Sequence, residues 1–168
     1  MNANQPNLEF LATGSADLDR ILGGGLPVRS INLIAGEPGT GKTLLALQMV
    51  FHLARQGRKC VYFTTLSEPS LKLVRYMQQF SFFDESLVDR AVVFADIGSV
   101  IRGKSEEAIL TEITTRVERE EPAVVVIDET TVRKGVRRVI EGDVGSELRR
   151  MLRKDGIDVE VVPSQVRS

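Results

Sequence analysis

The chain has 168 residues, which is enough for one sizeable hydrophobic core, so we expect a single domain over residues 1–168. Its composition, 42% hydrophobic and 27% charged with a net charge of −1, is ordinary for a globular protein and argues against a disordered one. No secretory signal and no bilayer-length apolar run is present, and the single cysteine, Cys60, excludes an internal disulfide, so we expect a cytoplasmic protein without membrane contact.

Five apolar runs rich in Val and Ile predict strands that are buried on both faces. They cover residues 31–36, 60–66, 91–97, 123–129 and 157–162. Between these runs, apolar residues recur every three to four positions, which predicts helices. The predicted helices cover residues 43–57, 69–80, 106–120 and 146–156. Such alternation predicts an α/β fold with a mostly parallel sheet and helices on both faces.

The octapeptide GEPGTGKT lies between the first predicted strand and the first predicted helix. In that context the pattern GxxxxGK[S/T] is typical of a phosphate-binding loop, whose backbone N–H groups converge on phosphate oxygens. Lys42 would reach the β and γ phosphates of a nucleotide, and the Thr43 hydroxyl would bind Mg²⁺. The residues predicted to hold the nucleotide are Gly36, Glu37, Pro38, Gly39, Thr40, Gly41, Lys42, Thr43 and Leu44.

A carboxylate closes the fourth predicted strand, where AVVVID ends at Asp128. A nucleoside triphosphate site needs such a group near its metal, because the cation must be held while it neutralises charge on the phosphates. We therefore predict that Thr43 and Asp128 hold Mg²⁺. The alternative is that Asp128 only caps the turn after its strand.

Residues 12–50, ATGSADLDRILGGGLPVRSINLIAGEPGTGKTLLALQMV, resemble the opening of the KaiC-like branch of the RecA-type ATPases. The shared features are a TG, an LD, an LGGGLP and the phosphate loop, and the similarity continues through the strand that ends at Asp128. The resemblance implies a RecA-like P-loop fold that binds ATP and Mg²⁺ and associates with itself or with other RecA-type subunits. It also places the strand of residues 157–162 between the phosphate-loop strand and the Asp128 strand, with Gln165 as a sensor of the γ phosphate.

The residue that would activate water for ATP hydrolysis is open at this point. Active members of the family usually carry two glutamates after the second strand, whereas residues 66–69 read LSEP and retain only Glu68. Glu68 is our first candidate for the base. It also fits the first turn of a helix that Ser67 would cap. Glu129 is the alternative base, because an Asp-Glu pair serves other P-loop ATPases in that way.

The two ends of the chain depart from the family pattern. Residues 130–144 do not match it, and the chain stops at Ser168, so we expect residues 130–168 to be a shortened or divergent end of the core. Residues 131–168 carry nine basic and six acidic side chains, against 13 and 17 in residues 1–130. No aromatic residues interleave with the basic side chains of residues 149–154, so a solvated helix face is favoured over a nucleic-acid surface. Residues 1–11 are expected to be a flexible N-terminus.

Three functions remain open from the sequence. The first is a slow Mg²⁺-dependent ATPase that acts as a regulatory or signalling switch, favoured by the intact loop, Asp128 and Glu68. The second is an ATP-binding module without hydrolysis, favoured by the missing first glutamate and the short C-terminal part. The third is a recombinase-like DNA-binding ATPase, which depends on the basic end and on analogy of fold alone.

Overall fold

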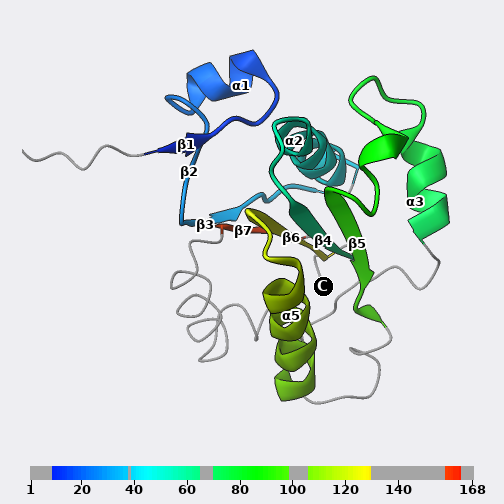
Figure 1. Ribbon diagram of the computed structural model, residues 1–168. Coiled ribbons are helices and arrows are strands. Elements are labelled where there is room, and N and C mark those ends of the chain that lie inside the picture. The colour runs from blue at the N-terminus through cyan, green and yellow to red at the C-terminus, as the bar shows by residue number, and fades with distance from the viewer. Residues whose placement is uncertain (1–8, 38, 65–69, 99–105, 130–157, 164–168) are drawn as a thin grey trace, which may run out of the picture.

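A parallel five-stranded sheet forms the centre of the molecule (Figure 1). The computed structural model describes residues 9–37, 39–64, 70–98, 106–129 and 158–163. The strands of the sheet are β3 (Ile31–Leu33), β4 (Cys60–Thr64), β5 (Val92–Asp96), β6 (Val124–Glu129) and β7 (Asp158–Pro163). Their order is β3-β7-β6-β4-β5, so β7 lies between the strand that precedes the phosphate loop and the strand that carries Asp128. Both the fold class and this position of β7 are confirmed.

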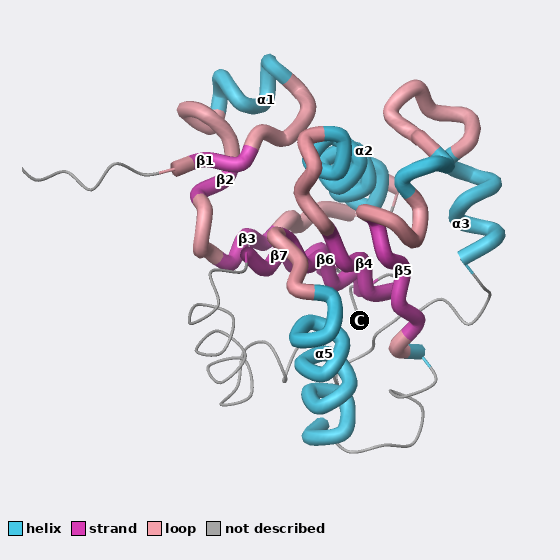
Figure 2. Tube along the Cα trace, viewed as in Figure 1, coloured by secondary structure: helices cyan, strands magenta, loops and turns pink. Residues whose placement is uncertain are grey.

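Helices cover both faces of the sheet, as Figure 2 shows. The helices α2 (Lys42–Arg55) and α3 (Ser70–Met77) pack on one face, and α5 (Glu106–Glu120) packs on the other. The side chains of β4 pack alternately on the two faces of the sheet, because successive side chains of a strand point in opposite directions. Cys60 and Tyr62 pack on the α2 side, whereas Val61 and Phe63 pack on the α5 side, and all four are fully buried.

The predicted elements agree with the observed ones, and the differences lie at their ends. The strand expected over residues 31–36 ends at Leu33, because the chain then leaves the sheet to form the phosphate loop. The helix expected over residues 69–80 ends at Met77. The Met77 carbonyl then accepts a hydrogen bond from the Phe80 N–H, which closes a tighter turn after the helix. The helix expected over residues 146–156 lies outside the described residues. Among the described helices, none combines the length and apolar character of a bilayer-spanning segment.

A small unit before the sheet was not predicted from the sequence. The strands β1 (Phe10–Leu11) and β2 (Leu26–Pro27) pair antiparallel, and the short helix α1 (Ala16–Ile21) lies between them in the chain. The pairing depends on Gly25, which has φ of +123°, and a Cβ there would lie 2.1 Å from the Leu11 carbonyl oxygen. The LGGGLP pattern thus permits a close approach of two backbones. Of the expected flexible N-terminus, residues 1–8 lie outside the described part of the chain.

The TG and LD patterns anchor this unit to α2. The Ser15 side chain caps α1 by accepting a hydrogen bond from the Leu18 N–H, and Asp19 accepts one from the Thr13 N–H at 2.8 Å. The Gly14 carbonyl accepts a hydrogen bond from the Gln48 side chain at 3.0 Å. A Cβ at Gly14 would lie 3.0 Å from His52, so the segment packs closely on α2. These contacts explain what the TG and LD patterns before the phosphate loop do in the fold.

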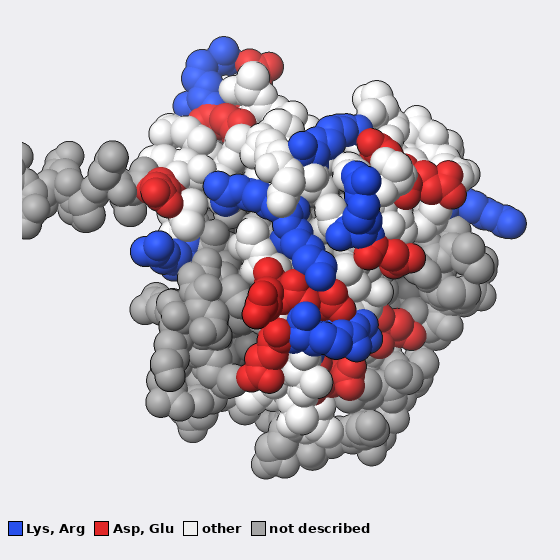
Figure 3. Space-filling view, in the orientation of Figure 1, with Lys and Arg blue, Asp and Glu red and all other residues white. Residues whose placement is uncertain are grey.

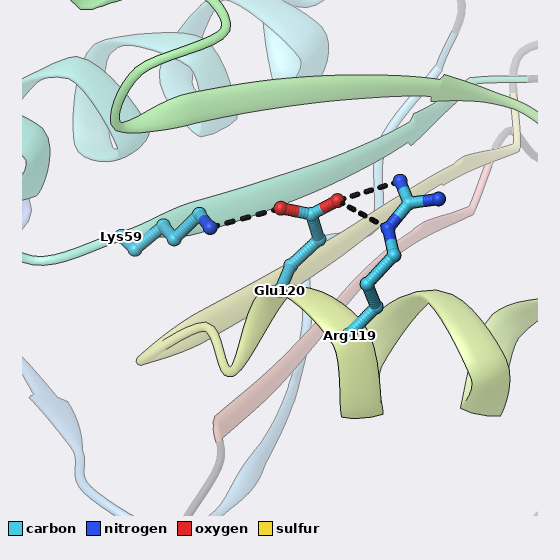
Figure 4. Close-up of polar contacts among 3 residues, drawn as sticks. All are labelled: Lys59, Arg119 and Glu120. Atoms are coloured by element: carbon cyan, nitrogen blue, oxygen red, sulfur yellow. Dashed lines mark hydrogen bonds and ion pairs between the residues drawn. The ribbon is translucent and has the colours of Figure 1, made fainter.

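An ion pair joins the end of α5 to the start of β4, at the edge of the sheet opposite Asp128 (Figure 4). The Glu120 carboxylate accepts from Lys59 Nζ at 2.9 Å and from Arg119 Nη2 at 2.6 Å. The hydrogen bond from Lys59, which contributes most, and the hydrogen bond from Arg119 hold the pKa of the Glu120 carboxyl below its ordinary value of 4.5. The Lys59 carbonyl also accepts from the Ala123 N–H at 2.8 Å, so the same corner is fixed through the backbone.

We predict that Glu120→Gln lowers the free energy of unfolding at pH 7 by about 0.5–1 kcal/mol, because both cations are partly exposed and water screens the pair. A carboxyl whose folded pKa lies below its unfolded pKa stabilises the fold above the unfolded value and loses this effect as the pH falls through the folded one. The difference in the free energy of unfolding between the wild type and Glu120→Gln should therefore become smaller below about pH 4. Urea unfolding at several pH values measures it, with the exposed Glu118→Gln as control. A deficit that is constant from pH 7 to pH 3 would contradict the role of the charge.

Candidate nucleotide site

The phosphate loop follows β3 and leads directly into α2. Gly39 and Gly41 have φ of +82° and +88°, a left-handed conformation that glycine adopts without strain. A Cβ at Gly36 would lie 2.8 Å from the Thr40 hydroxyl, so the loop also closes tightly on itself. Gly41 is the N-cap of α2 and has no side chain to accept from the first N–H groups of the helix. Those N–H groups and the helix dipole are the features by which such loops bind phosphate.

The Lys42 side chain folds back across the loop. Its ammonium donates to the Gly36 carbonyl at 2.8 Å and to the Glu37 carbonyl at 2.9 Å. The Thr40 hydroxyl also donates to the Glu37 carbonyl, at 2.8 Å. The loop is therefore curved by its own hydrogen bonds, and these bonds hold the positive charge of Lys42 against the loop backbone.

The Asp128 carboxylate lies at the end of β6 and faces the start of α2. Its Oδ2 accepts from the Thr43 hydroxyl at 3.0 Å and from the Tyr62 hydroxyl at 2.6 Å. Asp128 is only 3% exposed, so these donors replace the water that a carboxylate would otherwise bind. Two residues predicted as metal ligands, Thr43 and Asp128, are thus brought into contact although 85 positions separate them.

The strand order is what makes this contact possible. All five strands run in the same direction, so their carboxyl ends share one edge of the sheet, where ligands of open α/β sheets bind. Asp128 pairs in register with Thr64, the last residue of β4. The last described residue of β4 therefore lies beside Asp128.

The donor set at this edge fits Mg²⁺. Thr43 and Asp128 offer hydroxyl and carboxylate oxygens, which are the hard ligands that Mg²⁺ prefers. Mg²⁺ usually keeps several waters and takes few protein ligands besides the phosphates of its nucleotide. A hydroxyl can donate its hydrogen to a carboxylate while its lone pairs bind a cation, so the Thr43–Asp128 hydrogen bond is compatible with a bound metal.

The predicted site residues fall into two groups. The loop residues with described geometry and Asp128 lie together, at the carboxyl edge of the sheet. Pro38, Glu68 and Gln165 lie outside the described residues, and their roles stay predictions. Glu129 is the last residue of β6 and pairs with Pro163 of β7, but this backbone pairing does not test it as a base.

Tyr62 is the contact at this site that sequence reasoning missed. The residue lies inside the run CVYFT, which is typical of a strand buried on both faces, and was assigned only to the core. A signal was present, because a tyrosine inside a buried strand needs a partner for its hydroxyl. Two strands beside each other, one with a buried Tyr and one ending in Asp, would have pointed to the pair.

Comparison with known proteins identifies the family. The family model described as "ATPase: KaiC" matches residues 11–157. A UPF0273 protein of Thermotoga maritima is 30% identical in an alignment of 159 positions, which covers 86% of this chain and 65% of that protein. The DNA repair protein RadA of Mycolicibacterium smegmatis is 46% identical over 50 residues, 30% of this chain. The chain spans less than two thirds of the length of either relative, and 11% of RadA. With the phosphate loop, the strand order and a family match over most of its length, the chain belongs to the KaiC family of RecA-type ATPases.

Proposed function

We propose that this chain binds ATP with Mg²⁺ at residues 36–44 and Asp128 and hydrolyses it slowly, as a regulatory switch. The observation that carries the proposal is the contact between Thr43 and Asp128 beside the curled loop that holds Lys42. It brings a phosphate-binding loop, a cation and a pair of Mg²⁺ ligands to one edge of the sheet. Family membership supports nucleotide binding by the same parts of the chain.

Each residue then has a part in hydrolysis. Loop N–H groups and Lys42 bind and orient the phosphates, and Thr43 and Asp128 would hold the metal. Mg²⁺, when bound, neutralises charge on the β and γ phosphates. Water attacks the γ phosphorus, the bond to the bridging β–γ oxygen breaks, and ADP leaves with that electron pair. Glu68 would accept the proton of the attacking water.

The position of Glu68 along the chain supports its assignment. It follows Thr64, the register partner of Asp128, by four residues. Four residues span at most about 14 Å, so Glu68 stays within reach of the phosphate edge of the sheet. The loss of the first glutamate of the family pair is our reason for proposing slow turnover. Slow turnover suits a switch, because the bound state then persists long enough to be read by a partner.

Assembly and location belong to the same proposal. We expect self-association or association with other RecA-type subunits, and a cytoplasmic location. A second subunit matters chemically, because a basic residue supplied across an interface can raise phosphoryl-transfer rates by about 10³-fold or more. Turnover that appears only when another RecA-type subunit is added would place the limiting group on that subunit.

A DNA-directed ATPase is the second candidate, favoured by the similarity to the DNA repair protein RadA. That similarity covers 50 residues, and the nine basic side chains of residues 131–168 lie outside the described part of the chain. The face drawn in Figure 3 mixes basic and acidic side chains. Titration of labelled single-stranded DNA at several salt concentrations tests this candidate, since phosphate contacts make affinity fall steeply with salt. Binding below micromolar Kd with such a slope would favour it over the switch.

For the nucleotide site we predict that Lys42→Ala weakens ATP affinity at least ~10-fold, since a charge-assisted hydrogen bond contributes about 1.5–3 kcal/mol. Isothermal titration calorimetry measures the affinity. Lys59→Ala is the matched control, because Lys59 precedes β4 at the other end of the sheet. Equal affinity of wild type and Lys42→Ala would refute the site.

For hydrolysis we predict that Glu68→Gln lowers the single-turnover rate by about 10²- to 10⁴-fold, the usual contribution of a general base. ATP affinity should stay nearly unchanged, because the substitution keeps the size of the side chain and removes only its ability to accept a proton. Release of phosphate from a Mg²⁺–ATP complex, with excess protein, measures the rate.

Glu129→Gln is the comparison that decides between the two bases. If Glu129→Gln abolishes turnover and Glu68→Gln does not, the base is Glu129. If the wild-type chain releases no phosphate above background yet binds ATP, the module without hydrolysis is correct.

A further inference from the structure

Tyr62 contacts Asp128 from the neighbouring strand. Thr64 is the register partner of Asp128, and Tyr62 precedes Thr64 by two residues, so it lies diagonally opposite on the same face of the sheet. Its hydroxyl reaches Asp128 Oδ2 at 2.6 Å. Hydroxyl–carboxylate hydrogen bonds of 2.5–2.7 Å are characteristic of a charged acceptor, and they are about twice as strong as neutral ones.

The tyrosine is held more firmly than the second donor to the same oxygen. Tyr62 is fully buried in the middle of the sheet, and its ring packs on Phe94 with 5.6 Å between ring centroids. Thr43, in contrast, is half-buried in the first turn of α2, next to the phosphate loop. Its hydrogen bond to Oδ2 is also longer, at 3.0 Å. The tyrosine therefore supplies the rigid constraint on the carboxylate.

This arrangement separates two tasks. Thr43 belongs to the loop and helix that receive the nucleotide, and its oxygen would bind the metal. Tyr62 belongs to the sheet and contacts no part of the loop in the hydrogen bonds described for it. A hydrogen bond from the sheet fixes the plane of the Asp128 carboxylate before any ligand arrives. Such outer partners of metal ligands typically change metal affinity by 10- to 100-fold when they are removed.

We propose that Tyr62 is a positioning residue, which orients the Asp128 carboxylate for Mg²⁺-dependent nucleotide binding. The inference rests on the proposed function, since it assigns Asp128 to the metal. It goes further by assigning a role to a residue of the buried core. A purely structural role would require only that the hydroxyl have some partner, and would leave the metal dependence of binding untouched.

The test is Tyr62→Phe, which removes one oxygen atom and keeps the ring against Phe94. Affinity for ADP is measured by calorimetry in excess Mg²⁺ and in EDTA, and the ratio of the two gives the gain due to the metal. We expect this gain to fall by about 10-fold in the variant, while affinity in EDTA changes less than about twofold. Without metal, binding would depend on the loop N–H groups and Lys42, whereas the hydroxyl that the substitution removes donates to Asp128.

Tyr76→Phe is the matched control, because it removes the same atom from the only other tyrosine of the chain. Tyr76 is 50% exposed on α3 and packs on Phe80, away from Asp128. The gain in ADP affinity that Mg²⁺ gives to Tyr76→Phe should equal the gain in the wild type. If Tyr62→Phe also keeps the full gain, the positioning role is wrong although the nucleotide site stands. If the wild type binds no ADP in either buffer, the proposed function fails, and the role of Tyr62 fails with it.

A second measurement covers the case in which Tyr62→Phe does not fold. The chain has no Trp, so in Tyr76→Phe the emission of Tyr62 is the only intrinsic fluorescence from Tyr or Trp. Its hydroxyl bonds the carboxylate that would hold the metal, so adding Mg²⁺ to the ADP-loaded protein should change this emission. Excess EDTA, which removes the Mg²⁺, should reverse the change in emission. An emission that does not respond to Mg²⁺, at concentrations that tighten ADP binding, would overturn the proposal.

Discussion

One buried carboxylate constrains the arrangement of three elements. Asp128 is almost fully buried, and a charged group in that position is destabilising unless hydrogen bonds replace its water. Thr43 at the start of α2 and Tyr62 in β4 provide such bonds. The helix, β4 and β6 must therefore keep their relative positions for the carboxylate to be tolerated. The same positions set the distance from the phosphate loop to the carboxylate, so the requirement for stability and the geometry of the site coincide.

The phosphate loop has a comparable internal constraint. Lys42 binds the carbonyls of Gly36 and Glu37, which bends the loop around the ammonium. Left-handed glycines at 39 and 41 allow that bend without strain. A phosphate that enters meets a loop that is already curved, and little conformational entropy is lost on binding. Preorganisation of this kind is consistent with a protein whose first task is to hold the nucleotide.

The sequence predicted the sheet well because each buried strand is a short run of Val and Ile between clear helical patterns. It assigned Thr43 and Asp128 to one metal site from the loop motif and from a carboxylate at a strand end, but it did not predict the hydrogen bond that joins them. It did not predict β1, β2 and α1, because two-residue strands carry no periodicity and the glycines of LGGGLP were interpreted only as a family pattern. Tyr62 was missed for a different reason. Hydrophobic patterns record that a residue is buried but not which polar atom its hydroxyl meets, and that partner is set by strand order rather than by neighbours in the chain.

The residues proposed for binding and those proposed for hydrolysis come from different parts of this chain. The proposed binding parts are the loop, α2 and the ends of β4 and β6, which also fill the core and bury charge, so they are tied to the stability of the fold. The residues proposed for hydrolysis and sensing, Glu68 and Gln165, follow β4 and β7 in the chain and lie outside the described residues. In this chain the first glutamate of the family pair is absent from residues 66–69, whereas the phosphate loop and Asp128 are both present. On the proposed function, such a chain would lose rate before it loses affinity, because a general base contributes to turnover and little to the binding of the nucleotide.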